Sequence, residues 1–407
     1  MYPLSPLPVD IQQAPSFRAF LNDLEMLGVK FVSDGGAAYA VIAARSNPRW
    51  WLLPLDNRRA AVAGLEMLHA GSLAAKAFKI GARFMAQFGS RRLLGQRQIR
   101  LCGAPDLAGS FDSRDLQFAY FTGTEGPHRK TALQIMDTDG GIQGYAKMSR
   151  KAHIRPYIRH EAEMLVRVAD LDLPSADVPQ VLAIRDSSDL TLLVTDSSNF
   201  TDGTSPWKPA AAHLRWLNDL RVRTGQVGAE SLLGELVQQL TAVENLAGID
   251  WRNRINRALT TLHPVAGEIQ LCLVHGDFTP WNCFVQSDRL YVFDWEYANP
   301  AWPVGFDLSH FLLSTIRQDQ KFRRLPQVLA TLARMQFDYD DDAARRALLL
   351  SLICHALFYL RRLAEARSTL ADWSEGPVRG TLIDVLLDSY QTTDFKGGKA
   401  RRCRDSG

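Results

Sequence analysis

The chain has 407 residues, of which 46% are hydrophobic and 22% charged, and this composition is typical of a globular protein with two or three domains. Its formal net charge at pH 7 is only +3. A charge this small for the length does not indicate binding to nucleic acid, so we expect no nucleic-acid partner.

The five cysteines form no C-x-x-C pair and have no histidine at zinc-finger spacing, so the sequence predicts neither a disulfide framework nor a zinc site. This usage favours a reducing, cytoplasmic location. The first residues, Met1 to Pro6, contain neither a basic nor a long apolar region, and we therefore expect no signal peptide. The most apolar stretch, Ala347 to Leu360, is shorter than the roughly 20 residues that cross a bilayer, so it predicts a buried helix.

The first hundred residues predict a small α/β extension, residues 1–105, to which the sequence assigns no role. Ala38 to Ala43 and Trp50 to Leu53 are short apolar runs typical of strands, and Asn57 is a candidate cap for the helix that follows. Gly, Pro, Asp and Ser residues cluster from Leu101 to Asp115, and this composition predicts a domain boundary there.

A second region, residues 106–196, alternates between short apolar runs and turns that contain glycine. Three runs typical of strands are followed by one helical pattern and two more strands, which predicts an antiparallel sheet with one helix. In chain order these elements are Leu116 to Phe121, Thr131 to Met136, Gln143 to Met148, the helix His160 to Ala169, Val181 to Ile184 and Leu190 to Val194.

Helical periodicity dominates residues 197–395, and residues 396–407 form a basic tail that we expect to be disordered. Three short apolar strands interrupt the helices: Leu271 to Val274, Cys283 to Gln286 and Leu290 to Phe293. Polar residues concentrate at the ends of these strands, which predicts a functional site in this region.

Three polar residues at these strand ends match the needs of phosphoryl transfer. The first strand leads into His275-Gly276-Asp277, Asn282 follows at the end of the loop, and the hairpin returns Asp294. Phosphoryl transfer needs a carboxylate that accepts the proton of the attacking hydroxyl and oxygen ligands that hold Mg²⁺. Protein kinases also separate their catalytic Asp and metal-binding Asn by four residues. A surface hairpin with Asp and Asn as turn residues is the alternative, and the order and spacing favour the kinase.

The residues His275-Gly276-Asp277, Asn282 and Asp294-Trp295-Glu296 resemble the signature of the aminoglycoside phosphotransferase and choline kinase family. The resemblance implies an α+β, bilobal, protein-kinase-like fold, with the N-terminal extension added to it, and the cofactors ATP and Mg²⁺. It also implies that Asp277 is the catalytic base, that His275 orients the loop, and that Asn282 and Asp294 bind magnesium.

Two further positions belong to this resemblance. Gly276 would permit the tight backbone of the loop. The segment Gly305-Phe306-Asp307-Leu308 is similar to the one that opens the next helix in the family. We expect Asp307 to be structural, either by holding the loop or by capping that helix.

A kinase also needs a cation for the α- and β-phosphates, usually a strand Lys that is paired with a helix Glu. Our candidates are Lys147, on a predicted strand, and Glu161, at the start of the following helix. Lys130 and Lys151 are alternatives to the lysine, and Glu163 is the alternative to the glutamate.

The turn between the first two strands of this region contains Gly123 and Gly126, whose backbone N–H groups are candidates for covering phosphates. It lacks the Gly-x-Gly-x-x-Gly pattern of protein kinases. An ordinary hairpin turn is therefore the alternative.

Residues 73–100 predict a basic amphipathic helix. Such a helix is typical of a segment that lies on an anionic membrane or binds an acidic partner. We favour packing on the rest of the protein, with the membrane surface as the alternative. No acidic residue lies between Lys76 and Arg100. The basic residues in this stretch are Lys79, Arg83, Arg91, Arg92 and Arg97. The apolar residues that recur at helical spacing are Leu73, Ala77, Ile80, Phe84 and Phe88.

Together these features predict a kinase that transfers the γ-phosphate of ATP to a hydroxyl of a small molecule. The alternatives are an inactive nucleotide-binding regulatory module and a membrane-surface assembly protein that acts through its N-terminal extension. Loss of Asp277 or Asp294 would mark an inactive module, so their presence favours the kinase. The sequence predicts neither the acceptor nor the oligomeric state.

Overall fold

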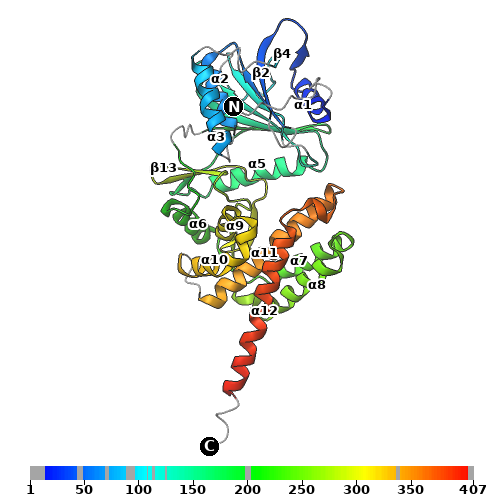
Figure 1. Ribbon diagram of the computed structural model, residues 1–407, viewed down its shortest axis with the longest axis vertical. Helices are drawn as coiled ribbons and strands as arrows, with labels where there is room; N and C mark the ends of the chain where they lie inside the picture. The colour runs from blue at the N-terminus through cyan, green and yellow to red at the C-terminus, as the bar shows by residue number, and fades with distance from the viewer. Residues whose placement is uncertain are drawn as a thin grey trace, which may run out of the picture. The chain divides into compact units, whose positions relative to one another are not determined.

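The computed structural model describes residues 14–43, 49–68, 73–88, 97–107, 109–111, 115–123, 126–197, 203–335 and 340–401. The chain forms two compact units. The first, here called the sheet unit, comprises Met1–Asp170 and Val178–Thr201, and the second, here called the helical unit, comprises Leu171–Asp177 and Asp202–Gly407. In Figure 1 the sheet unit runs mostly from blue to green and the helical unit mostly from green to red.

The sheet unit is built on a nine-stranded sheet in the order β1-β4-β2-β3-β5-β6-β7-β10-β9. All its strand pairs are antiparallel. The strands predicted from the sequence for residues 38–53 and 116–194 are confirmed, and β1 and β4 are additional. The bounds are β1 (Lys30–Val32), β2 (Ala37–Ala43), β3 (Trp50–Pro54), β4 (Gln98–Cys102), β5 (Gln117–Phe121), β6 (Thr131–Met136), β7 (Ile142–Ser149), β9 (Val181–Asp186) and β10 (Thr191–Asp196).

The domain boundary predicted between residues 101 and 115 falls inside this sheet. β3 precedes the boundary and β5 follows it, and the two strands pair through Trp51 opposite Phe121 and Leu52 opposite Tyr120. The N-terminal extension therefore continues the sheet of the region predicted to bind the nucleotide. Without β3, the edge of β5 would present unpaired backbone groups.

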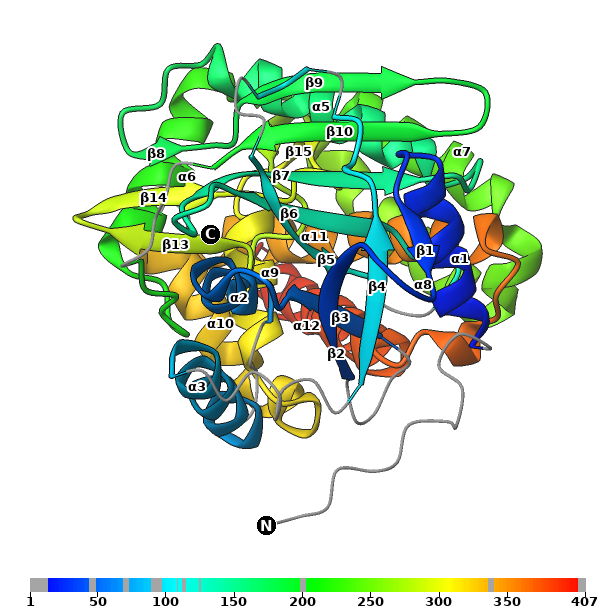
Figure 2. The same cartoon turned by 90° about the horizontal axis from the view of Figure 1, so that it is seen from above.

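The two faces of the sheet bury separate hydrophobic cores, because neighbouring residues of a strand point to opposite faces. On one face, α1 (Pro15–Glu25) contributes Phe17 and Phe20 to a core that includes Leu52. On the other face, α2 (Arg58–Gly64), η2 (Leu65–Met67) and α3 (Leu73–Gln87) cover a core that includes Leu53. Figure 2 shows α1 beside β1 and β4, and α2 and α3 together away from it.

Local sequence explains where several helices begin. The side chain of Asn57 caps α2, as predicted, by accepting hydrogen bonds from the backbone N–H groups of Arg59 and Ala60. In α5 (Arg155–Ala169) a proline occupies the first turn, where the missing N–H costs nothing. Asp340 caps α11 (Asp341–Glu365) by accepting a hydrogen bond from the N–H of Ala343 at 2.7 Å.

α5 is the helix that the sequence predicts for residues 160–169, and it begins one turn earlier than expected. It packs against β7, β9 and β10. Ile158, Ala162 and Leu165 lie buried on this helix at helical spacing. The packing brings the start of α5 over β7, where the predicted lysine lies.

The helical unit is dominated by long helices. Among the described residues, α11 is the helix that is long and apolar enough to cross a membrane, yet 78% of its apolar window is buried inside the protein. It packs against α7, α8, α9, α10 and α12, so the buried helix predicted for residues 347–360 is confirmed. The further bounds are α6 (Ala211–Thr224), α7 (Glu230–Ala242), α8 (Glu244–Leu262), η3 (His263–Glu268), α9 (Phe306–Thr315), η4 (Gln318–Gln320), α10 (Lys321–Met335), η5 (Leu370–Asp372) and α12 (Gly376–Arg401).

Two small sheets of the helical unit frame the predicted site. Their strand orders are β11-β12-β15 and β13-β14-β8. β12, β13 and β14 are the three strands that the sequence predicts here, whereas β15 was not predicted. The bounds are β8 (Ala176–Asp177), β11 (Gln226–Val227), β12 (Gln270–Val274), β13 (Cys283–Gln286), β14 (Arg289–Val292) and β15 (Asn299–Pro303).

One unit rich in antiparallel strands and one rich in helices confirm the predicted α+β class. The end of the chain differs in one respect from the expectation. α12 continues to Arg401, so residues 396–401 of the predicted basic tail belong to this helix. Residues 402–407 lie outside the described part of the chain.

Candidate active site

The loop that follows β12, residues 275–282, is here called the His-Gly-Asp loop, and it turns sharply at Gly276. The φ angle of Gly276 is +83°, in the left-handed region that favours glycine. A Cβ at this position would lie 2.0 Å from the carbonyl oxygen of Tyr297. Any other residue would therefore displace the backbone, and this geometry supports the tight turn expected of Gly276.

Asp307, in the first turn of α9, holds the backbone of this loop. Its Oδ2 accepts a hydrogen bond from the N–H of His275 at 2.7 Å, and its Oδ1 accepts one from the N–H of Gly276 at 3.0 Å. Burial raises the pKa of Asp307 to about 7, the two backbone donors lower it, and the charge of Asp277 raises it further. Of the two structural roles predicted, Asp307 therefore holds the loop, while Gly305 occupies the cap position of α9.

Two side chains fix the carboxylate of Asp277. Its Oδ1 lies 3.0 Å from Nε2 of His310, and its Oδ2 accepts a hydrogen bond from Nδ2 of Asn282 at 2.9 Å. The same Nδ2 donates to the carbonyl oxygen of Asp277 at 2.9 Å. The side chain of Asp277 is 30% exposed and that of His310 is 9% exposed. The carboxylate is thus held in one orientation and open to solvent, and such a group can accept a proton from a hydroxyl.

His275 connects the His-Gly-Asp loop to the segment that leads into Asp294. Its Nδ1 accepts a hydrogen bond from the N–H of Asp277 at 3.2 Å, and its Nε2 lies 2.9 Å from the carbonyl oxygen of Phe293. With Nδ1 as acceptor, Nε2 carries the proton and the ring is neutral. Burial lowers the pKa of His275, which favours this neutral form.

The hairpin of β13 and β14 brings Asn282 and Asp294 to the same end of the hairpin. Cys283 pairs with Val292, and the N–H of Phe293 donates to the carbonyl oxygen of Asn282 at 3.1 Å. Asp294 has a φ of +71°, which is uncommon for a residue with a side chain. Backbone strain of this kind concentrates at functional sites, where the surrounding structure holds a side chain in a set direction.

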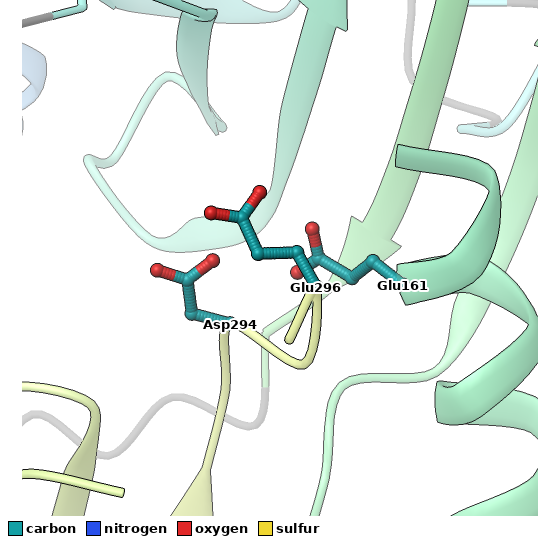
Figure 3. Close-up of side chains that lie close together, drawn as sticks. All are labelled: Glu161, Asp294 and Glu296. Carbon is teal, nitrogen blue, oxygen red and sulfur yellow. The ribbon is translucent and has the colours of Figure 1, made fainter. Parts of the chain in front are cut away.

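Glu296 lies two residues after Asp294, and the two carboxylates are neighbours (Figure 3). One oxygen atom of each carboxylate lies within 4.8 Å of the other. Two carboxylates at this distance repel each other, so a cation between them is stabilising. Glu296 was not assigned a role from the sequence, although its place in Asp294-Trp295-Glu296 was the available signal.

The donor set at the end of this hairpin fits a magnesium ion in chemical type. Mg²⁺ prefers oxygen ligands, and Asp294 and Glu296 supply carboxylates. Nδ2 of Asn282 faces Asp277, which leaves the amide oxygen Oδ1 as its donor toward a cation.

In the sheet unit, Lys147 of β7 pairs with Glu161 of α5, with Nζ 2.6 Å from Oε1. Glu161 is buried, whereas Lys147 is partly exposed. The structure therefore forms the pair that the sequence favours. Lys151 donates instead to the carbonyl oxygen of Gly126 at 2.8 Å, and Glu163 lies exposed on the outer side of α5.

The loop between β5 and β6 carries the two predicted glycines. Gly123 has a φ of +81° and Gly126 a φ of +142°, and both values favour glycine. Arg129 braces the base of this loop by donating to the carbonyl oxygen of Thr122 at 2.8 Å and pairing with Asp23 of α1 at 2.6 Å. Both charged side chains are buried, so the N-terminal helix is a fixed support of this loop.

Two exposed tryptophans lie beside the His-Gly-Asp loop. Trp281 belongs to the loop, and Trp207 follows a segment that is fixed to β13 by the pairing of Thr204 with Val285. The ring centroids are 6.3 Å apart, and Trp207 and Trp281 are 53% and 42% exposed. A solvent-exposed pair of large aromatic rings is a common element of ligand sites.

Tyr297 lies near the predicted base Asp277 and the predicted magnesium ligand Asp294. Burial raises its pKa well above the usual range, Arg362 lowers it, and the charges of Asp294 and Asp277 raise it again. The guanidinium of Arg362 lies 4.6 Å from the centroid of the tyrosine ring. The hydroxyl of Tyr297 therefore remains protonated at neutral pH.

Besides Glu296, sequence reasoning missed His310 and Trp207. His310 contacts Asp277 and lies three residues after Asp307, so both side chains emerge from the same side of α9. That spacing was the only available signal for His310. No sequence signal was available for Trp207, because its position depends on the pairing of its segment with β13.

A sheet unit with a Lys–Glu pair and a helical unit with Asp, Asn and Asp at strand ends together define a protein-kinase-like phosphotransferase architecture. The sequence model of the phosphotransferase enzyme family matches residues 134–349, more than half of the chain. The chain belongs to this family, and the resemblance stated from the sequence is confirmed.

Among solved structures, the chain is similar to the aminoglycoside phosphotransferase APH(4)-Ia, with 15% identity and a TM-score of 0.44 over 70% of this chain and 96% of that chain. It is also similar to the GDP complex of wild-type aminoglycoside 2'-phosphotransferase-IIIa, with 15% identity and a TM-score of 0.42 over 65% of this chain and 91% of that chain. A comparison with curated proteins gives no match.

Proposed function

We propose that the protein is an ATP-dependent phosphotransferase that transfers the γ-phosphoryl group to a hydroxyl group of a small molecule. The observation that carries this proposal is the fixed carboxylate of Asp277, held by His310 on one oxygen and by Asn282 on the other. An oriented, partly exposed carboxylate is suited to accept the proton of a hydroxyl that attacks phosphorus.

In the proposed reaction the acceptor oxygen forms a bond to the γ-phosphorus, while the bond from this phosphorus to the β,γ-bridging oxygen breaks and ADP leaves. The proton of the acceptor hydroxyl passes to the carboxylate of Asp277. His310 and Asn282 keep that carboxylate in position, and Asp307 keeps the loop backbone in place beneath it. Positioning of this kind supplies much of the catalysis in phosphoryl transfer.

Asn282, Asp294 and Glu296 are the proposed magnesium ligands. A bound Mg²⁺ would neutralise charge on the phosphates. The positive φ of Asp294 and the hairpin pairing at Asn282 fix the directions of these two side chains before any ion binds.

In the sheet unit, Lys147 is the proposed cation for the α- and β-phosphates. Glu161 accepts a hydrogen bond from its ammonium group at 2.6 Å and so limits the positions that this group can take. Gly123 and Gly126 would let backbone N–H groups of the loop approach phosphate oxygens without side-chain interference.

The exposed rings of Trp207 and Trp281 are the proposed contact surface for the acceptor. Trp281 immediately precedes Asn282 and lies in the same loop as Asp277. Aromatic rings contribute contact area at a low cost in side-chain entropy, which favours acceptors that carry a ring or another apolar face.

ATP consumption tests this proposal. Purified protein would be incubated with Mg²⁺ and ATP against a panel of sugars, amino alcohols, amino acids and aminoglycosides, with Asp277→Ala as the blank. We expect ADP formation that requires Mg²⁺ and one acceptor class, and a loss of about 100-fold or more in Asp277→Ala. Asp288→Ala, in the exposed turn of the same hairpin, is the matched control and should turn over normally. Equal turnover by Asp277→Ala and the wild type would overturn the proposal.

A further inference from the structure

The helix α3 is apolar on two faces, and among the residues that the structure describes one face is buried and the other is exposed. Its buried face carries Ala82 and Ala86, which pack in the core beneath α2 and η2. Its other face carries Ile80, Phe84 and Phe88, which are 70%, 63% and 63% exposed. These three residues are here called the α3 ridge. The spacing of four residues places them on one side of the helix.

This arrangement differs from the expectation that the apolar stripe packs on the rest of the protein. The small side chains of Ala82 and Ala86 allow the closest approach to α2, so they form the packed face instead. The rings of Phe84 and Phe88 contact each other, with centroids 4.4 Å apart. Burying an exposed Phe or Ile is favourable by about 1.5–3 kcal/mol per side chain, so an uncovered row of three favours a further binding event.

The helix that carries the α3 ridge has three cationic residues of its own, Lys76, Lys79 and Arg83. No Asp or Glu occurs in the sequence between Glu66 and Asp106. Glu66 is shared, since Lys79 lies 2.9 Å from one of its oxygens and Arg83 lies 3.2 Å from the other. A single carboxylate leaves this segment with a net positive charge. The helix that carries the ridge is therefore basic even after its pairing with Glu66.

We propose that the α3 ridge binds an anionic phospholipid surface. An amphipathic helix with Phe and Ile on one side and Lys and Arg beside them inserts its apolar residues at the boundary of headgroups and acyl chains, while the cations contact lipid phosphates. A second copy of this chain docked on the same face would bring two basic segments together, and like charges oppose that contact. Residues that are each about two-thirds exposed form a projecting row, which suits insertion into lipid.

Vesicle flotation of the full-length protein tests this proposal. The vesicles would contain phosphatidylcholine alone or phosphatidylcholine mixed with phosphatidylglycerol. The test variant is Ile80→Gln with Phe84→Gln, because glutamine keeps good helix propensity at both exposed positions. The matched control is Val222→Gln with Ile249→Gln, on α6 and α8, where the side chains are 67% and 64% exposed.

We expect the wild type and the control to float with the anionic vesicles. The test variant should lose at least tenfold in vesicle affinity, and added salt should weaken binding of the wild type. Three results would overturn the proposal: no association with anionic vesicles, equal association with phosphatidylcholine alone, or equal affinity of the test variant. Size-exclusion chromatography without lipid tests the alternative that the ridge binds a second copy of the chain. A dimer that the test variant abolishes would assign the ridge to a second copy and reject the lipid surface.

Discussion

Asp307 accepts a hydrogen bond from the backbone N–H of His275 at 2.7 Å, and through it α9 fixes the start of the His-Gly-Asp loop. The same carboxyl group accepts a bond from the N–H of Gly276. These two N–H groups face a side chain rather than a strand, so the conformation of the loop depends on one buried residue. The position of Asp277 follows from that support, because it is the next residue in the chain.

Replacing Asp307 should therefore destabilise the loop and the helical unit. Asp307→Ala leaves two buried N–H groups without an acceptor, at about 1–3 kcal/mol each, so we expect the free energy of unfolding to fall by about 2–6 kcal/mol. Asp307→Asn keeps one oxygen acceptor and should lose about half as much. Urea unfolding measures both values, and hydrogen exchange at the amides of His275 and Gly276 locates the effect. Unchanged protection of these amides in Asp307→Ala would contradict the assigned support.

Lys147 should control nucleotide affinity separately from stability. Lys147→Met removes the cation proposed to bind phosphate and should raise the KM for ATP by about 10- to 100-fold. It also leaves Glu161 buried and without its partner, which lowers stability. The double variant with Glu161→Gln should recover much of the stability but none of the ATP affinity. Recovery of ATP affinity in the double variant would show that Lys147 is only structural.

His213 makes stability depend on pH. Burial lowers its pKa to about 4, and the hydrogen bond that its Nδ1 accepts from the N–H of Ala210 requires the neutral ring. The unfolded chain binds this proton near pH 6.5 and the folded protein only near pH 4, so stability is lost as the pH falls between these values.

Asn at position 213 can accept the same backbone bond without titrating. We expect the wild type to lose about 2 kcal/mol more than His213→Asn between pH 7 and pH 5. Urea unfolding of both proteins at the two pH values gives the difference directly, and titrations shared by both proteins cancel. Equal losses would show that His213 is not buried as a neutral ring.

Trp281 should affect the acceptor and leave ATP unaffected. Trp281→Ala removes an exposed ring of the His-Gly-Asp loop, and we expect the KM for the acceptor to rise about tenfold with an unchanged KM for ATP. Ile249→Ala, also an exposed apolar residue, lies on α8, which packs on α7, α11 and α12, and serves as the control. A parallel change in both KM values would place Trp281 in the nucleotide site instead.

The strands and contacts near the site were largely predictable because their signals are local. Short apolar runs ended by Gly276 and Asp277 located β12, and the hairpin of β13 and β14 followed from the same pattern. The pairing of Lys147 with Glu161 was favoured by the order of strand and helix, and the structure forms it.

Other features depend on contacts between segments distant in sequence, which periodicity does not report. The pairing of Trp51 with Phe121 joins the N-terminal extension to the sheet, although the composition of residues 101–115 resembles a linker. Helical spacing identified the row from Ile80 to Phe88, but Ala82 and Ala86 form the packed face. In the same way, the contact of His310 with Asp277 follows from the placement of α9 rather than from a motif.

Magnesium-dependent ATP binding in the Asp294→Asn variant tests the central claim most directly, because it requires no knowledge of the acceptor. Isothermal titration calorimetry with and without Mg²⁺ would compare this variant with the wild type and with Asp277→Asn. We expect Mg²⁺ to strengthen ATP binding to the wild type and to Asp277→Asn, and this enhancement to fall at least about tenfold in Asp294→Asn. An enhancement in Asp294→Asn equal to that of the wild type, or no ATP binding by any of the three proteins, would contradict the account.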